Sequence, residues 1–423
     1  MEEWKQYKLG QLIELKNGIA FKSSEFVERG VPVIKIKNVK PNRILLDDIS
    51  YVSQKSSLNK KCFDLLPSDI LITMTGNRKE GGADSWVGKV TLFRLSGRYL
   101  LNQRVSAIRV KDPSLVDHIY LSYLLSGWDA QLYFINHSNS SGGQANISPD
   151  VVNNYIISLP SLSVQHHIAS ILKSFDSKIE CNRLINDNLE QQAQALFKSW
   201  FVDFEPFKNG EFVESEFGMI PKGWRILEAQ DIFNINIGKT PPRKEPEWFT
   251  ESNEDNIWVS IADMGNCGVF ISDSSEYLTD RAIKRFNIQM VEKNSVLLSF
   301  KLTVGRVAIA ASRLTTNEAI ARFILPDNSY REFLYLYLNQ YQYGNLGSTS
   351  SIATAVNSKT IKGMKLLNPP AEIIKSFSNN TKSLFEQIRN NQQEINHLVK
   401  LRDTLLPRLM SGELKVNEIT ELH

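Results

Sequence analysis

The sequence predicts an α/β (α+β) fold in which two globular domains are separated by two long antiparallel helices, with an internal pseudo-two-fold duplication. Three observations support this prediction. Two long segments repeat apolar residues at the spacing of a helix. A segment rich in short β-type runs and turn residues precedes each of them. The motifs of the first half recur in the second half in the same order, as an internal repeat requires.

The first long segment is Pro160–Phe201. After Pro160 it contains neither proline nor glycine, and its apolar residues return at gaps of three and four or their multiples. This spacing predicts a helix from Ile168 to Phe201, which is about 50 Å long at the usual rise. A single apolar stripe of that length is not stable in water, so the helix needs a partner.

The second long segment begins at Pro369 and supplies that partner. Its apolar residues follow gaps of three and four that come close to a heptad pattern. One constant shift places Pro369 on Pro160 and four apolar positions of one helix on four of the other. The residues predicted to pair the helices are Phe175, Ile179, Leu189, Leu196, Leu384, Ile388, Leu398 and Leu405.

The globular segments repeat as well. Trp4 and Gly18 recur at the same spacing as Trp224 and Gly238, and VGKV of the first half recurs as VGRV. VIKIKNV and WVSIADM are predicted to be equivalent alternating strands. The predicted boundaries are 1–160 for the first domain, 161–208 for the central helix, 209–370 for a linker and the second domain, and 371–423 for the C-terminal helix and tail.

Composition narrows the class of protein. The 423-residue chain is 42% hydrophobic with a formal net charge of +3, values that fit a folded protein. Three cysteines, odd in number and far apart, argue against a disulfide framework or a zinc site, so no metal is expected. No apolar run could span a membrane, and the N-terminus has no apolar signal core. We therefore expect a cytoplasmic protein.

The whole chain, from Trp4 to about Leu414, resembles the specificity (S) subunit of a type I restriction–modification system. The resemblance lies in the W…LG opening of each half and in the VGKV and VGRV segments. It also lies in NISPDVVNNYIISLPSL, which leads into a helix. The most specific part is the junction between the halves, LFKSWFVDFEPF followed by IPKGW.

The resemblance implies a function for each part. Each globular domain is expected to be a target recognition domain that reads one half of a bipartite sequence in double-stranded DNA. The paired helices are expected to act as a ruler for the spacer and to dock two methyltransferase (M) subunits. Restriction (R) subunits complete the nuclease. The chain itself is expected to be non-catalytic and to carry no cofactor, because S-adenosylmethionine belongs to the M subunit, which methylates adenine.

Three short motifs look catalytic, and each has a structural interpretation. Asn368-Pro369-Pro370-Ala371 resembles the target loop of amine methyltransferases but lacks the aromatic residue that stacks on a flipped base. Gly238-Lys239-Thr240 resembles the end of a P-loop, but Phe233 stands where the first glycine is needed. His166-His167 are adjacent on a helix and so point in different directions. No catalytic residue is expected.

Candidate DNA-binding residues are those whose side chains pair with base edges or phosphates and that occupy equivalent loops in both halves. Lys35 and Lys37 are expected on one face of a strand, and the others in loops. The candidates are Lys35, Lys37, Thr75, Asn77, Arg78, Lys79, Ser141, Gln144, Asn146, Ser299, Lys301, Thr303, Arg306, Ser350 and Thr354. Because the loops differ between the halves, we expect two different half-sites.

Two alternatives remain at this point. The chain could be a self-contained DNA methyltransferase or nuclease with an unrecognised active site. It could also be a stand-alone DNA-binding repressor. Incubation of the chain alone with DNA and a labelled methyl donor distinguishes the methyltransferase. A repressor would bind DNA without an M subunit and leave methylation unchanged when deleted.

Overall fold

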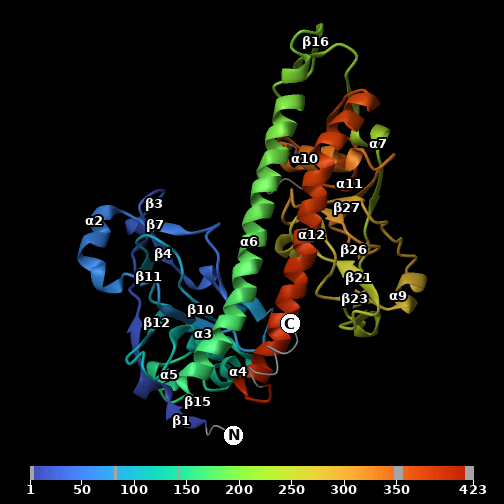
Figure 1. Ribbon diagram of the computed structural model, residues 1–423. Coiled ribbons are helices and arrows are strands. Elements are labelled where there is room, and N and C mark those ends of the chain that lie inside the picture. The colour runs from blue at the N-terminus through green and yellow to red at the C-terminus, as the bar shows by residue number, and fades with distance from the viewer. Residues whose placement is uncertain (1–3, 81–82, 142, 347–355, 415–423) are drawn as a thin grey trace. The chain divides into compact units, whose positions relative to one another are not determined.

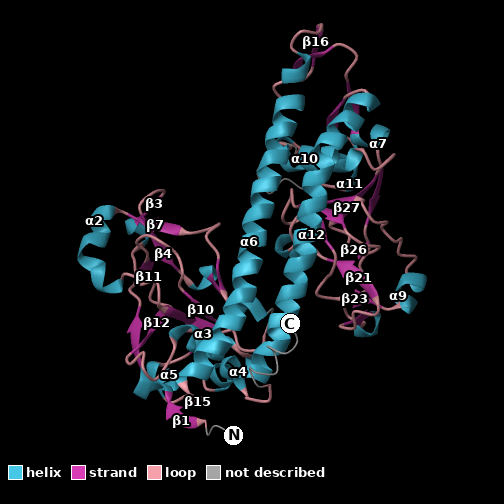
Figure 2. Ribbon diagram, viewed as in Figure 1, coloured by secondary structure: helices cyan, strands magenta, loops and turns pink. Residues whose placement is uncertain are grey.

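The structure, a computed structural model, describes residues 4–80, 83–141, 143–346 and 356–414 (Figures 1 and 2). The chain forms two compact units. Unit 1 consists of Met1–Lys178 with His397–His423, and unit 2 consists of Ile179–Asn396. Each unit therefore contains one globular part together with a portion of both long helices.

Two helices of 40 residues each dominate the chain, α6 (Leu162–Phe201) and α12 (Ala371–Met410). At the usual rise each is about 60 Å long. α12 starts directly after two prolines, which suit a helix start because their missing N–H would be unpaired there. α6 starts more than a turn before the predicted Ile168. Its buried Gln165 donates hydrogen bonds to the carbonyls of Pro160 and Leu115 (3.0 Å each) and so anchors this polar first turn.

The globular part of unit 1 contains two four-stranded sheets and a strand pair next to α6 in sequence. The first sheet has the order β10 (Val90–Leu92), β8 (Ile70–Thr73), β12 (Val105–Val110), β2 (Ile13–Asn17). The second has the order β11 (Leu100–Leu101), β4 (Val31–Ile34), β7 (Ser50–Val52), β3 (Phe26–Val27). The pair is β1 (Lys5–Lys8) with β15 (Ile156–Leu159). The helices of this part are α1 (Leu9–Leu12), α2 (Gln54–Ser57), α3 (His118–Ser126), α4 (Trp128–Asn136) and α5 (Pro149–Asn153).

The globular part of unit 2 repeats this plan. Its first sheet has the order β19 (Asn234–Ile237), β27 (Ile320–Ile324), β24 (Val296–Ser299), β25 (Val307–Ala310), β22 (Phe270–Ile271). The second has the order β20 (Phe249–Thr250), β23 (Tyr277–Leu278), β21 (Asn256–Val259), β26 (Thr315–Thr316). β18 (Arg225–Glu228) pairs with β28 (Lys365–Asn368). The helices of this part are α7 (Ala229–Ile232), α8 (Ile261–Asn266), α9 (Asp280–Arg285), α10 (Tyr330–Gln340) and α11 (Ser358–Lys362).

The duplication extends to single glycines. The Gly18 N–H donates to the Val105 carbonyl, and the Gly238 N–H donates to the Ile320 carbonyl, both at 3.2 Å. A Cβ atom on Gly18 would lie 2.1 Å from a carbonyl oxygen of the neighbouring strand segment, and one on Gly238 would meet the equivalent oxygen at the same distance. Each turn therefore requires glycine for the same steric reason. The predicted duplication is confirmed by this shared topology.

The predicted alternating strands end earlier than expected in both units. VIKIKNV was expected to be one strand, but β4 ends at Ile34 and a 3₁₀ turn follows over Ile36–Asn38. The Asn38 side chain accepts the Lys35 N–H at 3.0 Å and stabilises this turn. In the equivalent place, β21 gives way to α8, which Ser260 caps. Lys35 and Lys37 consequently do not share a strand face.

The junction between the halves is folded. After α6 come a short 3₁₀ helix, Glu205–Phe207, and a hairpin of β16 (Phe212–Ser215) and β17 (Gly218–Pro221). Trp224 of the IPKGW motif lies 5.0 Å from Phe207 and 5.8 Å from Phe201 between ring centroids. The aromatic residues of the junction motif therefore form one cluster that fixes the C-terminal end of α6 in unit 2.

None of the described helices combines the length and apolar character that crossing a membrane requires. Within the same described ranges, no three His, Cys, Asp or Glu side chains are grouped as a metal site would need.

We expect Gly238→Ala to destabilise the protein, because its Cβ would lie 2.1 Å from the carbonyl oxygen of Asn317. Overpacking of this kind costs about 1–3 kcal/mol. Gly344→Ala is the matched control, since nothing lies within 4 Å of its added Cβ. Chemical denaturation measures both free energies of unfolding. Equal values for the two variants would contradict the close approach.

Candidate DNA interface and helix seam

In unit 1 the structure joins two of the predicted DNA-binding loops. β13 (Asn139–Ser141), β14 (Gln144–Asn146) and β9 (Thr75–Gly76) form one three-stranded sheet. The Thr75 hydroxyl donates to Asn146 Oδ1 at 3.0 Å. Two loops far apart in the sequence are thus joined. Thr75 is buried and Asn146 half-buried, while Gln144 beside them adds an exposed amide. Ser141 belongs to β13, but its side chain is outside the described part.

Positive charge lies beside this surface. Arg78 donates to the Ser138 carbonyl at 2.5 Å, and Lys79 lies 5.9 Å from the centre of the Trp128 ring. Arg104, which the sequence reasoning missed, donates to Gln144 Oε1 at 3.4 Å. The sequence does not show that Arg104 and Gln144 are neighbours, because 40 positions separate them along the chain.

The remaining candidates of unit 1 have partners of their own. Asn77 donates from its amide to Ser85 Oγ at 3.2 Å. Lys35 donates to Ser50 Oγ at 2.9 Å and lies over the Phe26 ring, and burial lowers its pKa. Lys37 forms an ion pair with Asp48. These two lysines belong to the region around β4 and β7 and are not joined to Thr75 and Asn146.

In unit 2 the candidates separate into buried and exposed groups. Ser299 is fully buried, where its hydroxyl donates to the Thr303 carbonyl (2.6 Å) and accepts the Arg306 N–H (3.0 Å). The Arg306 guanidinium turns to the Ile261 carbonyl at 2.5 Å. Lys301 and Thr303 are exposed on the turn between β24 and β25. Ser350 and Thr354 lie outside the described residues.

The helix seam of unit 2 combines aromatic and polar pairs. The rings of Phe201 and Phe377 lie 4.8 Å apart between centroids. Farther along, Asn182 donates to Glu394 Oε2, and Asn391 donates to Asn186 Oδ1, both at 2.8 Å. As residue numbers rise along α6, partner numbers fall along α12, so the helices are antiparallel here. Sequence periodicity did not reveal these two contacts, in which the amides of Asn182 and Asn391 are buried.

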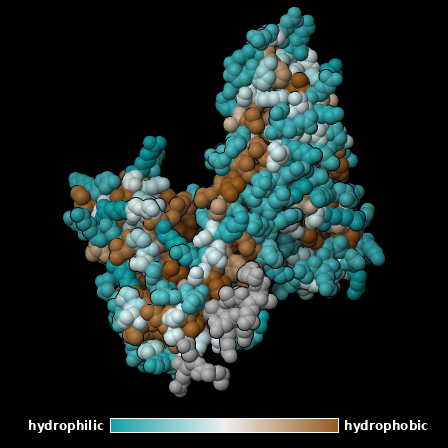
Figure 3. Space-filling model, viewed as in Figure 1, coloured by the Kyte–Doolittle hydropathy of each residue, from teal (hydrophilic) through white to brown (hydrophobic). Residues whose placement is uncertain are grey.

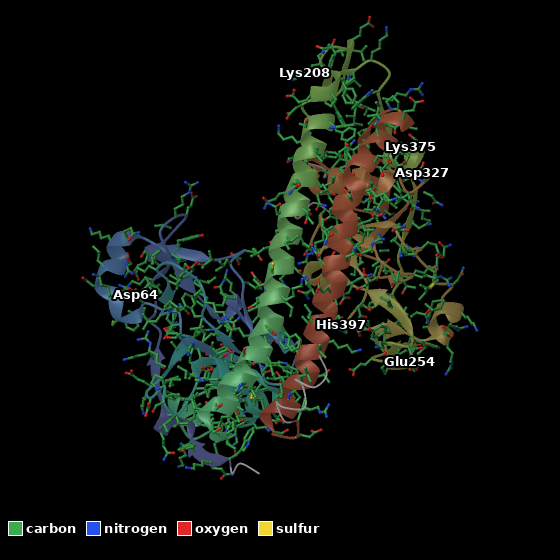
Figure 4. The ribbon with its side chains drawn as sticks, in the orientation of Figure 1. Asp64, Lys208, Glu254, Asp327, Lys375 and His397 are labelled. Atoms are coloured by element: carbon green, nitrogen blue, oxygen red, sulfur yellow. The ribbon has the colours of Figure 1, made fainter. Side chains whose placement is uncertain are left out.

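The helix seam of unit 1 contains an ion pair. Arg402 donates to Asp176 Oδ1 at 2.7 Å, and the Tyr123 hydroxyl donates to the other oxygen of Asp176 at 2.5 Å. Leu172 of α6 and Leu409 of α12 are buried in the same cluster. His397, labelled in Figure 4, begins the part of α12 that belongs to unit 1.

The predicted helix-pairing residues differ in burial. Ile179 and Ile388 are buried, and the other six are half-buried, all eight within the described part. Four of the half-buried residues pack against the cores of their own units, and they are Leu189, Leu196, Leu384 and Leu405. Phe175 and Leu398 are half-buried without being assigned to a core cluster.

These features describe a duplicated α/β scaffold on paired helices, with polar loops at equivalent turns and no metal cluster among its described residues. A family model described as the type I restriction modification DNA specificity domain matches residues 1–191 and 221–400. The chain belongs to this family of DNA specificity subunits.

Relatives and solved structures agree with the family. The chain is 26% identical to the type I restriction enzyme HindI specificity subunit of Haemophilus influenzae, over 98% of this chain and 100% of the relative. It is 30% identical to the MjaIX specificity subunit of Methanocaldococcus jannaschii, over 75% and 73%. The crystal structure of a type I S subunit from M. genitalium covers 96% of each chain with a TM-score of 0.54 at 15% identity, a likeness of fold.

Glu190 on α6 offers a test, through pH, of the packing of α6 against α10. The Tyr335 hydroxyl donates to its carboxylate at 2.8 Å, and burial raises the pKa of Glu190 above 4.5. Because the folded state holds the proton more tightly, stability falls as the pH rises from the unfolded pKa to the folded pKa and stays lower above it. Glu190→Gln keeps an acceptor for Tyr335. We expect it to stabilise the fold at pH 7–8 by on the order of 1 kcal/mol and to have no such effect below about pH 4.

Glu386→Gln is the matched control, since Glu386 is exposed and its carboxylate lies 3.8 Å from Lys382 Nζ in a surface ion pair. Thermal melts across pH measure both variants. If the change in melting temperature caused by Glu190→Gln is as independent of pH as that of the control, burial does not raise the pKa of Glu190.

Proposed function

We propose that this chain selects the DNA sequence on which a type I restriction–modification complex acts. Each globular part reads one half of a bipartite target, and α6 with α12 sets the number of base pairs between the halves. The proposal depends on one observation, the internal duplication of a chain that belongs to a DNA specificity family. The two copies share one backbone plan, in which Gly18 and Gly238 make the same close approach, but their polar loops differ.

The chemistry of the loops supports reading of base edges. Asn and Gln amides pair with adenine, and Arg with guanine, in the major groove. Arg104 donates a hydrogen bond to the amide oxygen of Gln144 beside Asn146, and this arrangement presents amide and guanidinium groups on one surface. Unit 2 presents Lys301 and Thr303 instead. Different groups on equivalent frames favour two different half-sites.

Exposed apolar side chains support the docking of methyltransferase subunits. Leu184 and Ile185 on α6 are 61% and 41% exposed, and brown side chains gather along the middle of this helix in Figure 3. Val202 and, on the junction hairpin, Phe217 and Met219 are also about half exposed or more. Apolar patches of this kind mark contacts with other proteins. The partner subunits would supply S-adenosylmethionine and the methyl transfer, and this chain no catalytic group.

The direct test compares the methylomes of cells with and without this chain, both carrying the neighbouring methyltransferase gene. We expect methyladenine to disappear at one bipartite motif when the chain is removed. Unchanged methylation at every motif would contradict the proposal. Methyl transfer to DNA by the purified chain alone would support an enzyme instead.

A second prediction concerns the surface of unit 1. Each good contact to a base edge contributes about 1–3 kcal/mol of discrimination. We therefore expect Gln144→Ala combined with Asn146→Ala to relax the preference at one half-site by about tenfold or more, while the other half-site stays unchanged. Lys208→Ala, an exposed change beyond the end of α6 (Figure 4), is the control. Equal loss at both half-sites would contradict separate reading.

A further inference from the structure

Unit 2 contains a small polar cavity that the proposed function does not yet use. It has a volume of about 190 Å³ and lies where the ends of β19 and β27 meet the segment after α9. Sites for whole small molecules usually measure about 300–1,000 Å³. The cavity is therefore suited to a single small group. Its lining residues are Asn236, Ile237, Lys239, Asn287, Gln289 and Arg322.

Arg322 is the buried cation of this cavity, with only 4% of its surface exposed. Its guanidinium donates to the Gln289 carbonyl (2.7 Å) and to the Ile237 carbonyl (2.9 Å). Its Nε atom is buried without a hydrogen-bond partner, and no carboxylate among the described residues pairs with it. Buried charges are normally neutralised by a counter-charge, because removal from water costs free energy. That cost lowers the pKa of Arg322.

Lys239 adds a second cation at the exposed rim. Its Nζ lies 3.2 Å from the Phe286 carbonyl and 3.3 Å from the Asn287 carbonyl, and no described carboxylate pairs with it. The side chains of Asn287 and Gln289 are exposed beside it. Guanidinium, ammonium and amide N–H groups are all donors, and the two charged ones bind oxyanions strongly. The cavity thus presents positive charge that main-chain carbonyls position but do not neutralise.

Unit 1 shows that the fold does not need these cations. Arg322 stands opposite Asn236 in the β27–β19 pair, and Ala107 stands opposite Lys16 in the equivalent β12–β2 pair. The N–H of Lys239 donates to the Thr316 carbonyl, just as that of Ile19 donates to the Leu101 carbonyl. Alanine and isoleucine therefore occupy the same places in the other copy. The cations Arg322 and Lys239 are therefore specific to unit 2. Because the fold does not require them, we infer that they bind a ligand.

We propose that this cavity binds one phosphate group of the DNA backbone beside the half-site that unit 2 reads. This inference rests on the proposed function and extends it. A single phosphodiester carries one negative charge and oxygen acceptors suited to Arg322 and Lys239, whereas an entire nucleotide exceeds the cavity. The exposed rim of Lys239, Asn287 and Gln289 leaves it reachable from outside. Unit 1 makes no equivalent contact.

The test replaces the two cations by the residues of unit 1, as Arg322→Ala with Lys239→Ile in the full chain. Binding to a duplex that carries the complete target is measured from low to high salt. Each lost phosphate contact lowers the slope of log K against log salt by about 0.9. We expect that decrease, with weaker binding to target and non-target duplexes alike. Lys382→Ala on α12, outside the cavity, is the control for removal of a cation. Lys239→Ile alone, at an exposed position, guards against a folding defect of the double variant.

A second arm uses inorganic phosphate without DNA. We expect phosphate to raise the melting temperature of the wild-type chain more than that of the double variant, at matched ionic strength. If the double variant leaves the salt slope unchanged but loses the stabilisation by phosphate, the cavity does not bind the DNA backbone and is instead a site for free phosphate. If the salt slope is unchanged and phosphate does not raise the melting temperature of the wild-type chain more than that of the double variant, the cavity is not an oxyanion site. If the wild-type chain shows no target preference, the proposed function fails, and the phosphate arm alone decides the cavity.

Discussion

The pairing of α6 with α12 is the constraint on which the rest of the structure depends. Each helix has one apolar stripe along 40 residues and requires a partner to cover it. Apolar contacts alone would tolerate a slip along the seam. The hydrogen bonds Asn182–Glu394 and Asn186–Asn391 in unit 2 do not, because a slipped register would leave the buried amides of Asn182 and Asn391 without these partners. Register is thereby fixed in the same helices that complete both globular cores.

The two globular parts share one backbone plan but differ in the side chains on their surfaces. Gly18 and Gly238 make the same close approach to a neighbouring strand, so the two copies keep one backbone plan. The side chains on that plan differ, as Arg322 and Ala107 illustrate at equivalent strand positions. On the proposed function, a backbone plan that tolerates such changes would let one copy acquire a new half-site while the other copy is unchanged. This separation is what reading of a bipartite target needs.

Most of the architecture could be predicted from the sequence, because helical periodicity and repeated motifs are local signals. Contacts between distant segments could not. Strand β4 ends early because the Asn38 side chain accepts a hydrogen bond in the turn that follows. Ser299 is buried at the end of β24, and only Lys301 and Thr303 farther along the turn are exposed. Arg104 and Arg322 were missed for the same reason, since their importance comes from burial and partners supplied by other strands.

The most direct test of the central claim, that the helices set the spacer, lengthens both of them at the boundary of the two units. Four helix-forming residues are inserted between Lys178 and Ile179 and four between Asn396 and His397, which leaves the polar pairs inside each unit intact. Four residues add about 6 Å, and base pairs rise by about 3.4 Å. Sequencing of methylated adenines should then show both half-sites unchanged and a spacer longer by one or two base pairs. Unchanged half-sites with an unchanged spacer would contradict the account.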